Sequence, residues 1–368
     1  MLSAFKALSD TELHSLFQNK IREIPAVDKK LTATAQAHLD NLTKPLGSLG
    51  RLETLATRLF CIGAGKQPLA VDKAMLFTIA ADHGVVEEGV SHATQEVTGQ
   101  MLQNFLNGGA GINVICKSAG WDFLAVDAGV AGPPLPDAPK LINAKIMPGT
   151  ANIAKGPAMN QKEVLTALLL GINLADIAQE RGYKCLGTGE MGIGNTTPSS
   201  ALFCAWLGLT PVESVGPGAG LVQDLLTHKA AVVKKALTVN SKAIESNNPL
   251  QVLAALGGIE IAVMAGIMLG AAKNRLPVLV DGFIATAAYL AAFKLNPLVS
   301  DYAIFAHCSA ESAHQNVLNR IGRKPLLDMR MRLGEGTGAA LALPILRAAA
   351  DIYNNMASFK SAGVTVQK

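Results

Sequence analysis

Aromatic and charged residues are scarce in this sequence. Only 5% of its 368 residues are Phe, Trp or Tyr, too few to favour the stacking surfaces that bind single-stranded nucleic acids. Charged residues make up 16%, and the 32 Lys and Arg are dispersed among 28 Asp and Glu, so no polybasic segment predicts a nucleic-acid or membrane partner. Hydrophobic residues reach 49%, which excludes a disordered or coiled-coil protein.

Paired cysteine motifs and a leader segment are also missing. The five cysteines are scattered and form no C-x-x-C pair, a usage typical of small buried thiols in a reducing compartment. The opening segment, MLSAFKALSDTELHSL, contains acidic residues and leads into no apolar core of about 7–15 residues, unlike a secretory signal. We therefore expect a cytoplasmic protein.

The most apolar stretch runs from Val252 to Ala272 and is interrupted by Glu260 beside two glycines. A membrane-spanning helix needs about 20 consecutive apolar residues with few or no charges. The stretch therefore predicts a buried helix of a globular domain rather than a membrane span.

Short apolar runs alternate with helical patterns after residue 73. Runs of this length, bounded by glycine or polar residues, are typical of strands buried on both faces, and their alternation with helices predicts an α/β fold with an open parallel sheet. The expected strands are 74–80, 123–126, 184–186, 277–280 and 303–306, and the expected helices are 95–106, 161–181, 221–237, 259–272, 282–294, 311–321 and 338–356.

The N-terminal part has more charged residues and amphipathic spacing. It predicts helices over residues 11–20, 29–42 and 51–61, the first of them capped by Ser9-Asp10. We expect residues 1–70 to pack with 338–368 as a small helical domain. Residues 71–337 would then form the sheet domain, which carries the chemistry.

Polar and glycine residues follow all five expected strands. The carboxyl ends of parallel strands meet at one edge of the sheet, where ligands bind, so these clusters predict a site there. The clusters are ADHGV (81–85), DAG (127–129), GTGEMGIGNTT (187–197), DG (281–282) and HCSAE (307–311).

The third cluster contains a G-x-G-x-x-G pattern at residues 187–192. A dinucleotide site would need an acidic residue about 20 positions further on, but Glu213 lies in a Pro- and Gly-rich stretch and Glu190 would repel a pyrophosphate. Backbone amides followed by Asn195 and Thr196 at a helix start suit a single phosphate or a ribose. The alternative is an ordinary helix cap by Asn195 or Thr196.

Several histidines follow the expected strands and raise the question of a metal. Asp82-His83, His307-Cys308 and His314 carry suitable groups, but no H-x-H, H-E-x-x-H or other paired spacing connects them. We interpret them as side chains that hydrogen-bond loops at strand ends, and we expect no metal.

Glu335 lies in the glycine-rich segment MRLGEGTGAA (331–340), just before the last helix. Glycines let a ligand approach the backbone, and a helix start offers unpaired amides. A carboxylate in such a poorly hydrated pocket has a raised pKa and can act as a base near neutral pH. The alternative is a helix-start Glu stabilised by the helix dipole.

Taken together, these segments resemble the nicotinate-nucleotide–dimethylbenzimidazole phosphoribosyltransferase family, which makes the lower-ligand nucleotide of cobalamin. The matching stretches follow the family order and cover nearly the whole chain. They are KPLGSLGRLE (44–53), ADHGVVEEGV (81–90), GTANIAKGPAM (149–159), GTGEMGIGNTT (187–197), GGIEIAVMAGIMLGAA (257–272), PVLVDGFIATAA (277–288), AHCSAE (306–311) and MRLGEGTGAALALPI (331–345).

The resemblance implies an enzyme that transfers the 5-phosphoribosyl group of nicotinate mononucleotide to 5,6-dimethylbenzimidazole, giving α-ribazole 5′-phosphate and nicotinate. It further implies a homodimer, a Rossmann-like parallel sheet and a small helical domain built from both termini. No cofactor or metal is expected.

The same resemblance assigns residues. Glu335 matches the catalytic Glu of the family, and Lys229 matches a lysine that pairs with the phosphate. The donor site would comprise Glu190, Gly192, Asn195, Thr196, Lys229, Ser309, Arg332, Gly334 and Gly336.

The acceptor pocket departs from the family pattern. Ala93 and Met101 occupy positions where the family has Ser and Gln, and Ser91, Gln95 or Gln100 could replace those contacts. The preferred base therefore stays open. The expected base pocket comprises Ser91, Ala93, Met101 and Leu333.

Two other functions are weighed against this one. A nucleotide-binding regulatory protein would keep the fold without turnover, and an assay of nicotinate release would separate it from the enzyme. A dinucleotide-dependent oxidoreductase would change the absorbance of its nicotinamide and would need no benzimidazole.

Overall fold

A six-stranded parallel sheet forms the centre of the computed structural model, which describes residues 2–216 and 223–365. The strand order is β3-β2-β1-β4-β5-β6, so the direction of winding reverses between β1 and β4. This Rossmann-like order creates a crevice at the carboxyl ends of the central strands. The strands are β1 (Ala74–Ala81), β2 (Trp121–Gly129), β3 (Leu141–Asn143), β4 (Cys185–Met191), β5 (Val278–Val280) and β6 (Ala303–Phe305).

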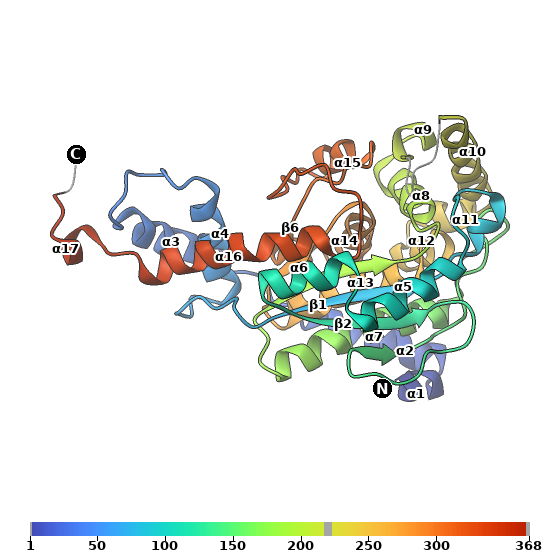
Figure 1. Cartoon of the computed structure of the whole chain (residues 1–368), viewed down its shortest axis with the longest axis horizontal. Coiled ribbons are helices and arrows are strands. Elements are labelled where there is room, and N and C mark those ends of the chain that lie inside the picture. The colour runs from blue at the N-terminus through green and yellow to red at the C-terminus, as the bar shows by residue number, and fades with distance from the viewer. Residues whose placement is uncertain (1, 217–222, 366–368) are drawn as a thin grey trace.

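Helices cover both faces of the sheet (Figure 1). The described part of the chain contains α1 (Leu2–Ala7), α2 (Asp10–Arg22), α3 (Leu31–Asp40), α4 (Arg51–Ile62), α5 (Glu96–Asn107), α6 (Gly111–Ala119), α7 (Gln161–Glu180), α8 (Thr196–Leu207), α9 (Pro211–Ser214), α10 (Gln223–Val239), α11 (Ser241–Glu245), α12 (Pro249–Leu256), α13 (Ile259–Lys273), α14 (Phe283–Leu295), α15 (His314–Arg320), α16 (Thr337–Asn355) and α17 (Phe359–Ala362). Short 3₁₀ helices span Gly84–Glu88 and Pro297–Asp301.

Side chains of β1 alternate between two hydrophobic cores. Met75 and Phe77 pack on the face covered by α7, α13 and α14, whereas Ala74 and Leu76 pack on the face covered by α4, α5, α6 and α16. All eight residues of β1 are buried. The predicted α/β fold, with strands buried on both faces, is confirmed.

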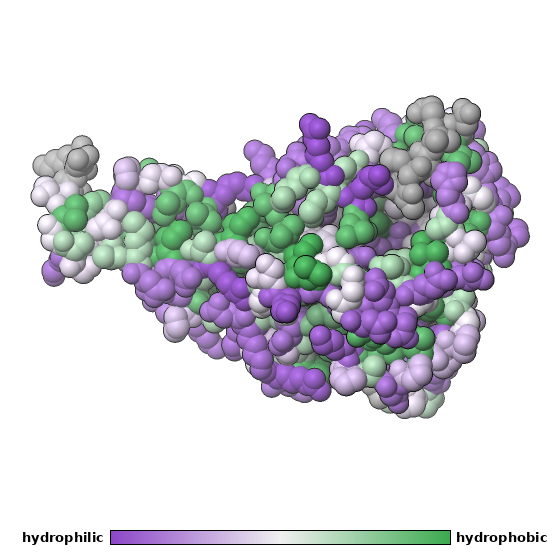
Figure 2. Space-filling view, in the orientation of Figure 1, coloured by the Kyte–Doolittle hydropathy of each residue, from purple (hydrophilic) through white to green (hydrophobic). Residues whose placement is uncertain are grey.

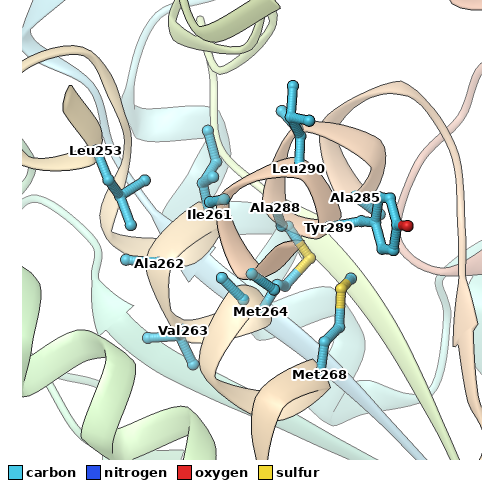
Figure 3. Close-up of a cluster of buried hydrophobic side chains, with 14 of the residues drawn as sticks. Leu253, Ile261, Ala262, Val263, Met264, Met268, Ala285, Ala288, Tyr289 and Leu290 are labelled. Carbon is cyan, nitrogen blue, oxygen red and sulfur yellow. The ribbon is translucent and has the colours of Figure 1, made fainter. Parts of the chain in front are cut away.

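α13 is the helix expected from the most apolar stretch, and it lies inside the protein. Every residue of α13 except Lys273 is buried, and Figure 3 shows its side chains packed against those of α14. A Cβ added to Gly266 would lie 2.2 Å from the carbonyl oxygen of Leu168, so the glycine allows α7 and α13 to approach closely. Among the described helices, none combines the length and the apolar character that a bilayer crossing requires.

An arm projects from the sheet at the far end of α16, as Figure 1 shows; it consists of α3, α4, α17 and the last turns of α16. Tyr353 lies at its centre, where its carbonyl bonds to His38 Nε2 at 2.8 Å and its ring lies 5.4 Å from that of Phe60. Arg58 ties the arm to the sheet by donating to the carbonyls of residues 300, 301 and 303.

The first two helices lie away from the arm (Figure 1). α2 begins with the expected cap at Ser9, packs against α7 and forms a 3.2 Å ion pair between Lys20 and Asp176. The grouping of residues 1–70 with 338–368 stays a prediction, but it includes two helices that contact the sheet domain instead.

Three strands differ from the expectation. β2 runs from Trp121 to Gly129, so the DAG cluster expected after it belongs to the strand. β3 was not predicted because it is a three-residue, partly exposed edge strand without a continuous apolar run. β4 continues beyond Leu186 to Met191, so Gly187 and Gly189 are strand residues and not parts of a dinucleotide loop. The helix expected over 221–237 is α10, and its predicted start lies outside the described residues.

Candidate active site

A cavity of about 340 Å³ lies beyond the carboxyl ends of β4, β5 and β6, which is within the size range of small-molecule sites. The polar clusters after these three strands line it. The clusters at the ends of β1 and β2 have a different role, since Asp82 accepts the Ala131 N–H and Asp127 accepts the Val130 N–H. Three of the five expected clusters thus lie at one cavity, whereas the other two stabilise turns.

Glu335 reaches this cavity from an unusual turn. The φ angles of Gly334, Glu335 and Gly336 are +80°, +63° and +95°, three consecutive left-handed residues. Glycine adopts this conformation readily, whereas a residue with a Cβ pays about 1–2 kcal/mol. The Thr78 hydroxyl donates to the Glu335 carbonyl at 2.7 Å, and the Ile112 N–H donates to Glu335 Oε2 at 3.1 Å. The fold thus holds this carboxylate in a defined position.

Three carboxylates in the cavity lining, Glu190, Asp281 and Glu335, have raised pKa values, in each case mainly through burial. Burial raises the pKa of Glu335 above its ordinary value, and the charge of Asp281 raises it further. Burial likewise raises the pKa of Glu190 to about 8, although the Asn195 side-chain amide donates to it. Glu190 can therefore exchange a proton near neutral pH, and the pKa of Glu335 is shifted in the same direction.

The cavity lining also contains a buried cation. Lys229 is fully buried, and its ammonium group donates to Thr196 Oγ1 at 2.6 Å and to the Gly216 carbonyl at 3.2 Å. Burial lowers the pKa of Lys229 to about 8, against the charge of Glu311, which raises it. A lysine beside the first turn of α8 is a suitable partner for a phosphate.

Two of the three histidines at the strand ends, His83 and His314, are hydrogen-bonded within the protein, whereas the buried Nδ1 of His307 has no partner among the described residues. His83 pairs with the buried Glu260 at 2.8 Å, and His314 Nδ1 accepts the Ser309 N–H at 2.8 Å. Burial lowers the pKa of His314 to about 3, so this ring is neutral. Within the described residues, no group of three or more His, Cys, Asp or Glu side chains is arranged to hold a metal ion.

Comparison with known proteins agrees with the predicted resemblance over nearly the whole chain. A family model described as "Phosphoribosyltransferase" matches residues 24–364. The chain belongs to this family.

Named relatives extend the comparison. The nicotinate-nucleotide–dimethylbenzimidazole phosphoribosyltransferase of Oleidesulfovibrio alaskensis is 58% identical over 94% of this chain and 97% of its own length. The Chlorobaculum tepidum protein of the same name is 49% identical over 95% and 98%. A crystal structure of the enzyme from Thermus thermophilus superposes with a TM-score of 0.86 at 44% identity, covering 92% of this chain and all of that one.

The fold brings most of the predicted site residues of this family member together. Gly336 belongs to the Glu335 turn but is not among the residues that line the cavity, and Ala93 also lies outside the lining, with its N–H donating to Ser91 Oγ at 3.2 Å. The predicted residues that line the cavity are Ser91, Met101, Glu190, Gly192, Asn195, Thr196, Lys229, Ser309, Arg332, Leu333, Gly334 and Glu335.

The lining also contains three buried polar residues, Asp281, His307 and Glu311. They belong to the clusters expected at strand ends, but the sequence predicted no substrate contact for any of them. Glu311 follows two residues after Ser309, and its Oε2 has no hydrogen-bond partner in the described structure.

Proposed function

We propose that the chain transfers the 5-phosphoribosyl group of nicotinate mononucleotide to 5,6-dimethylbenzimidazole or a related base, in the synthesis of the cobalamin lower ligand. The products are α-ribazole 5′-phosphate and nicotinate. The observation that carries the proposal is that one cavity is lined both by the Glu335 carboxylate, held in a left-handed turn, and by the buried Lys229. We take the identity of the two substrates from the names of the relatives.

The donor would bind with its phosphate at Lys229 and the start of α8, where Thr196 lies. Glu190 and Asn195 bond to each other in the cavity wall and would contact the ribose hydroxyls. The other residues proposed for the donor site are Gly192, Ser309, Arg332, Gly334 and Gly336.

Bond formation and bond breaking balance without an external acid. One ring nitrogen of the acceptor attacks C1′, and the bond from C1′ to nicotinate breaks with its electron pair returning to the pyridinium nitrogen. Attack opposite the leaving group inverts the β linkage to α. The acceptor becomes a benzimidazolium, and the proton on its second nitrogen passes to the Glu335 carboxylate.

Two effects would provide the rate. A positioned base contributes about 100- to 10,000-fold, and holding donor and acceptor in line avoids much of the entropic cost of their encounter. The acceptor would lie against Met101 and Leu333, with Ser91 as a polar partner, since these residues line the same cavity as Glu335. Methionine adapts to varied ring shapes, which favours a permissive base pocket.

We also propose that the enzyme works as a cytoplasmic homodimer. Leu333 is 59% exposed at the rim of the cavity, and Val114 on the neighbouring helix α6 is 63% exposed. Apolar side chains in this position favour contact with a second subunit.

The test is product analysis after incubation with nicotinate mononucleotide and dimethylbenzimidazole, followed by the Glu335→Gln variant. We expect α-ribazole 5′-phosphate and nicotinate from the wild type. The E335Q variant should keep its affinity for nicotinate mononucleotide and lose about 100- to 10,000-fold in kcat. Failure of the wild type to release nicotinate would contradict the proposed function, and a near-normal kcat in E335Q would remove the base role alone.

A further inference from the structure

Asp281 is a buried carboxylate in the wall of the site for which the reaction described above has no use. It directly follows β5 and is only 2% exposed. Burial alone would favour its neutral form. The role of this carboxylate therefore depends on the groups that contact it. These groups belong to α16 and to the segment after β6, both distant in sequence.

The carboxylate caps α16 from outside that helix. Its Oδ1 accepts the Ala339 N–H at 2.9 Å. Burial raises the pKa of this carboxyl, whereas the backbone N–H groups of Ala339, Gly338 and Gly336 lower it. The first residues of a helix have no intrahelical partner for their N–H groups, and the N-cap of α16 is a glycine without a side chain. Asp281 therefore supplies the cap that Gly336 cannot.

The capped helix start is continuous with the turn of Glu335. The Thr337 N–H and hydroxyl both donate to the Gly334 carbonyl, at 3.0 and 2.8 Å. The three left-handed residues that precede α16 would relax to other conformations if the helix start could shift. Fixing the first turn of α16 thus fixes the direction of the Glu335 side chain.

His307 supports this arrangement from the other side. Its Nε2 lies 3.7 Å from Asp281 Oδ1, and a Cβ added to Gly338 would lie 2.0 Å from the His307 ring. The ring therefore packs directly on the backbone that Asp281 caps. Glycine at 338 permits this approach, which a side chain would block.

We propose that Asp281 is a positioning residue of the reaction, which holds the Glu335 carboxylate at the acceptor by capping α16 from the end of β5. The inference rests on the proposed role of Glu335 as the base. Asp281 would contact neither substrate and would act through the left-handed turn that carries Glu335.

The experiment is a double-mutant cycle with Asp281→Ala, Glu335→Gln and the combined variant. D281A should lose about 10- to 100-fold in kcat, because small displacements of a catalytic group have effects of this size. KM for both substrates should stay within about threefold of the wild type. In the E335Q background, D281A should cause no further loss, since the group it positions is already removed.

Two further variants separate positioning from stability. Asp281→Asn retains an acceptor oxygen and should recover most of the kcat lost in D281A. Asn160→Ala removes the side-chain cap of α7, which bonds the Glu163 N–H at 2.9 Å, and should lower stability while kcat is unchanged. If D281A does not fold, Asp281→Glu, which displaces the acceptor oxygens by one methylene, takes its place in the cycle.

Several results would overturn the positioning role. They are a D281A kcat within about threefold of the wild type, an equal loss in the E335Q background, or a D281N variant no better than D281A. These results differ from failure of the proposed function. An E335Q variant with near-normal kcat contradicts the base itself, whereas an inactive E335Q beside a normal D281A contradicts Asp281 alone.

Discussion

Lys229 carries a charge whose presence at physiological pH depends on its surroundings. Burial lowers the pKa of this ammonium to about 8. The group is charged below that pH and becomes neutral above it, so its attraction for a phosphate is lost as the pH rises through about 8.

Replacing Lys229 with Ala should weaken nicotinate mononucleotide far more than the acceptor base. A charge-assisted hydrogen bond contributes about 1.5–3 kcal/mol, which corresponds to roughly 10- to 150-fold in affinity. Wild-type affinity for the donor should also fall above pH 8, and the variant should lack this alkaline decline. Titration calorimetry with the donor across this pH range measures both effects.

Lys235→Ala is the matched control on the same helix. Lys235 is exposed and pairs with Glu88 at 3.1 Å, away from the cavity lining. Its removal should leave donor affinity unchanged, because exposed ion pairs contribute little. Equal losses in the two variants would remove Lys229 from the phosphate site.

Some site residues could be predicted from the sequence and others could not, for a physical reason. Glu335 stands among glycines next to a helix start, a local pattern that indicates a held carboxylate. Asp281 has no such local pattern. Its partner Ala339 is far along the chain, and only the packing of α16 beside β5 brings the two together.

At the scale of elements, short runs of three to seven residues located the five buried strands. The same criterion could not find β3, whose three residues are partly exposed, nor the full length of β4. A glycine inside a strand is unusual, but Gly189 belongs to β4. Only glycine fits at this position, because a Cβ there would lie 2.1 Å from the Glu335 carbonyl oxygen. That requirement comes from the turn packed against the strand.

The contact between α7 and α13 allows a stability prediction. Gly266→Ala would gain about 1 kcal/mol from helix propensity, but its new methyl group would lie 2.2 Å from the Leu168 carbonyl oxygen. Both atoms belong to rigid helices, so overpacking should exceed that gain and lower the free energy of unfolding by about 1–3 kcal/mol. Urea unfolding monitored by circular dichroism measures the change.

Gly156→Ala provides the comparison, because nothing lies within 4 Å of a Cβ at that position. Its free energy of unfolding should stay within about 0.5 kcal/mol of the wild type. A G266A protein as stable as G156A would mean that the two helices can separate at no cost.

For the whole molecule, the apolar surface beside the active site predicts association. Figure 2 shows apolar side chains gathered along α16 and α6 and extending toward the arm. Leu333 packs at the start of α6, since a Cβ on Gly111 would lie 2.8 Å from it, and Val114 is one turn further on. The patch therefore borders the cavity.

Sedimentation should show a dimer, and Val114→Glu should shift it toward monomer, because a charge in an apolar contact is poorly solvated. Val239→Glu at the end of α10 is the control, since Val239 is also exposed, at 46%, but belongs to another surface. A monomeric wild type, or equal dissociation by both variants, would contradict a contact at α6.

The left-handed turn also bears on how this chain can change over generations. Glycine at position 335 would relieve the backbone strain that a side chain imposes there, so a substitution to glycine should raise stability while it removes the proposed base. Only selection for the reaction keeps a carboxylate in that conformation. A lineage that no longer needs the product should therefore lose Glu335 early, while its sheet, its buried lysine and its capped α16 persist.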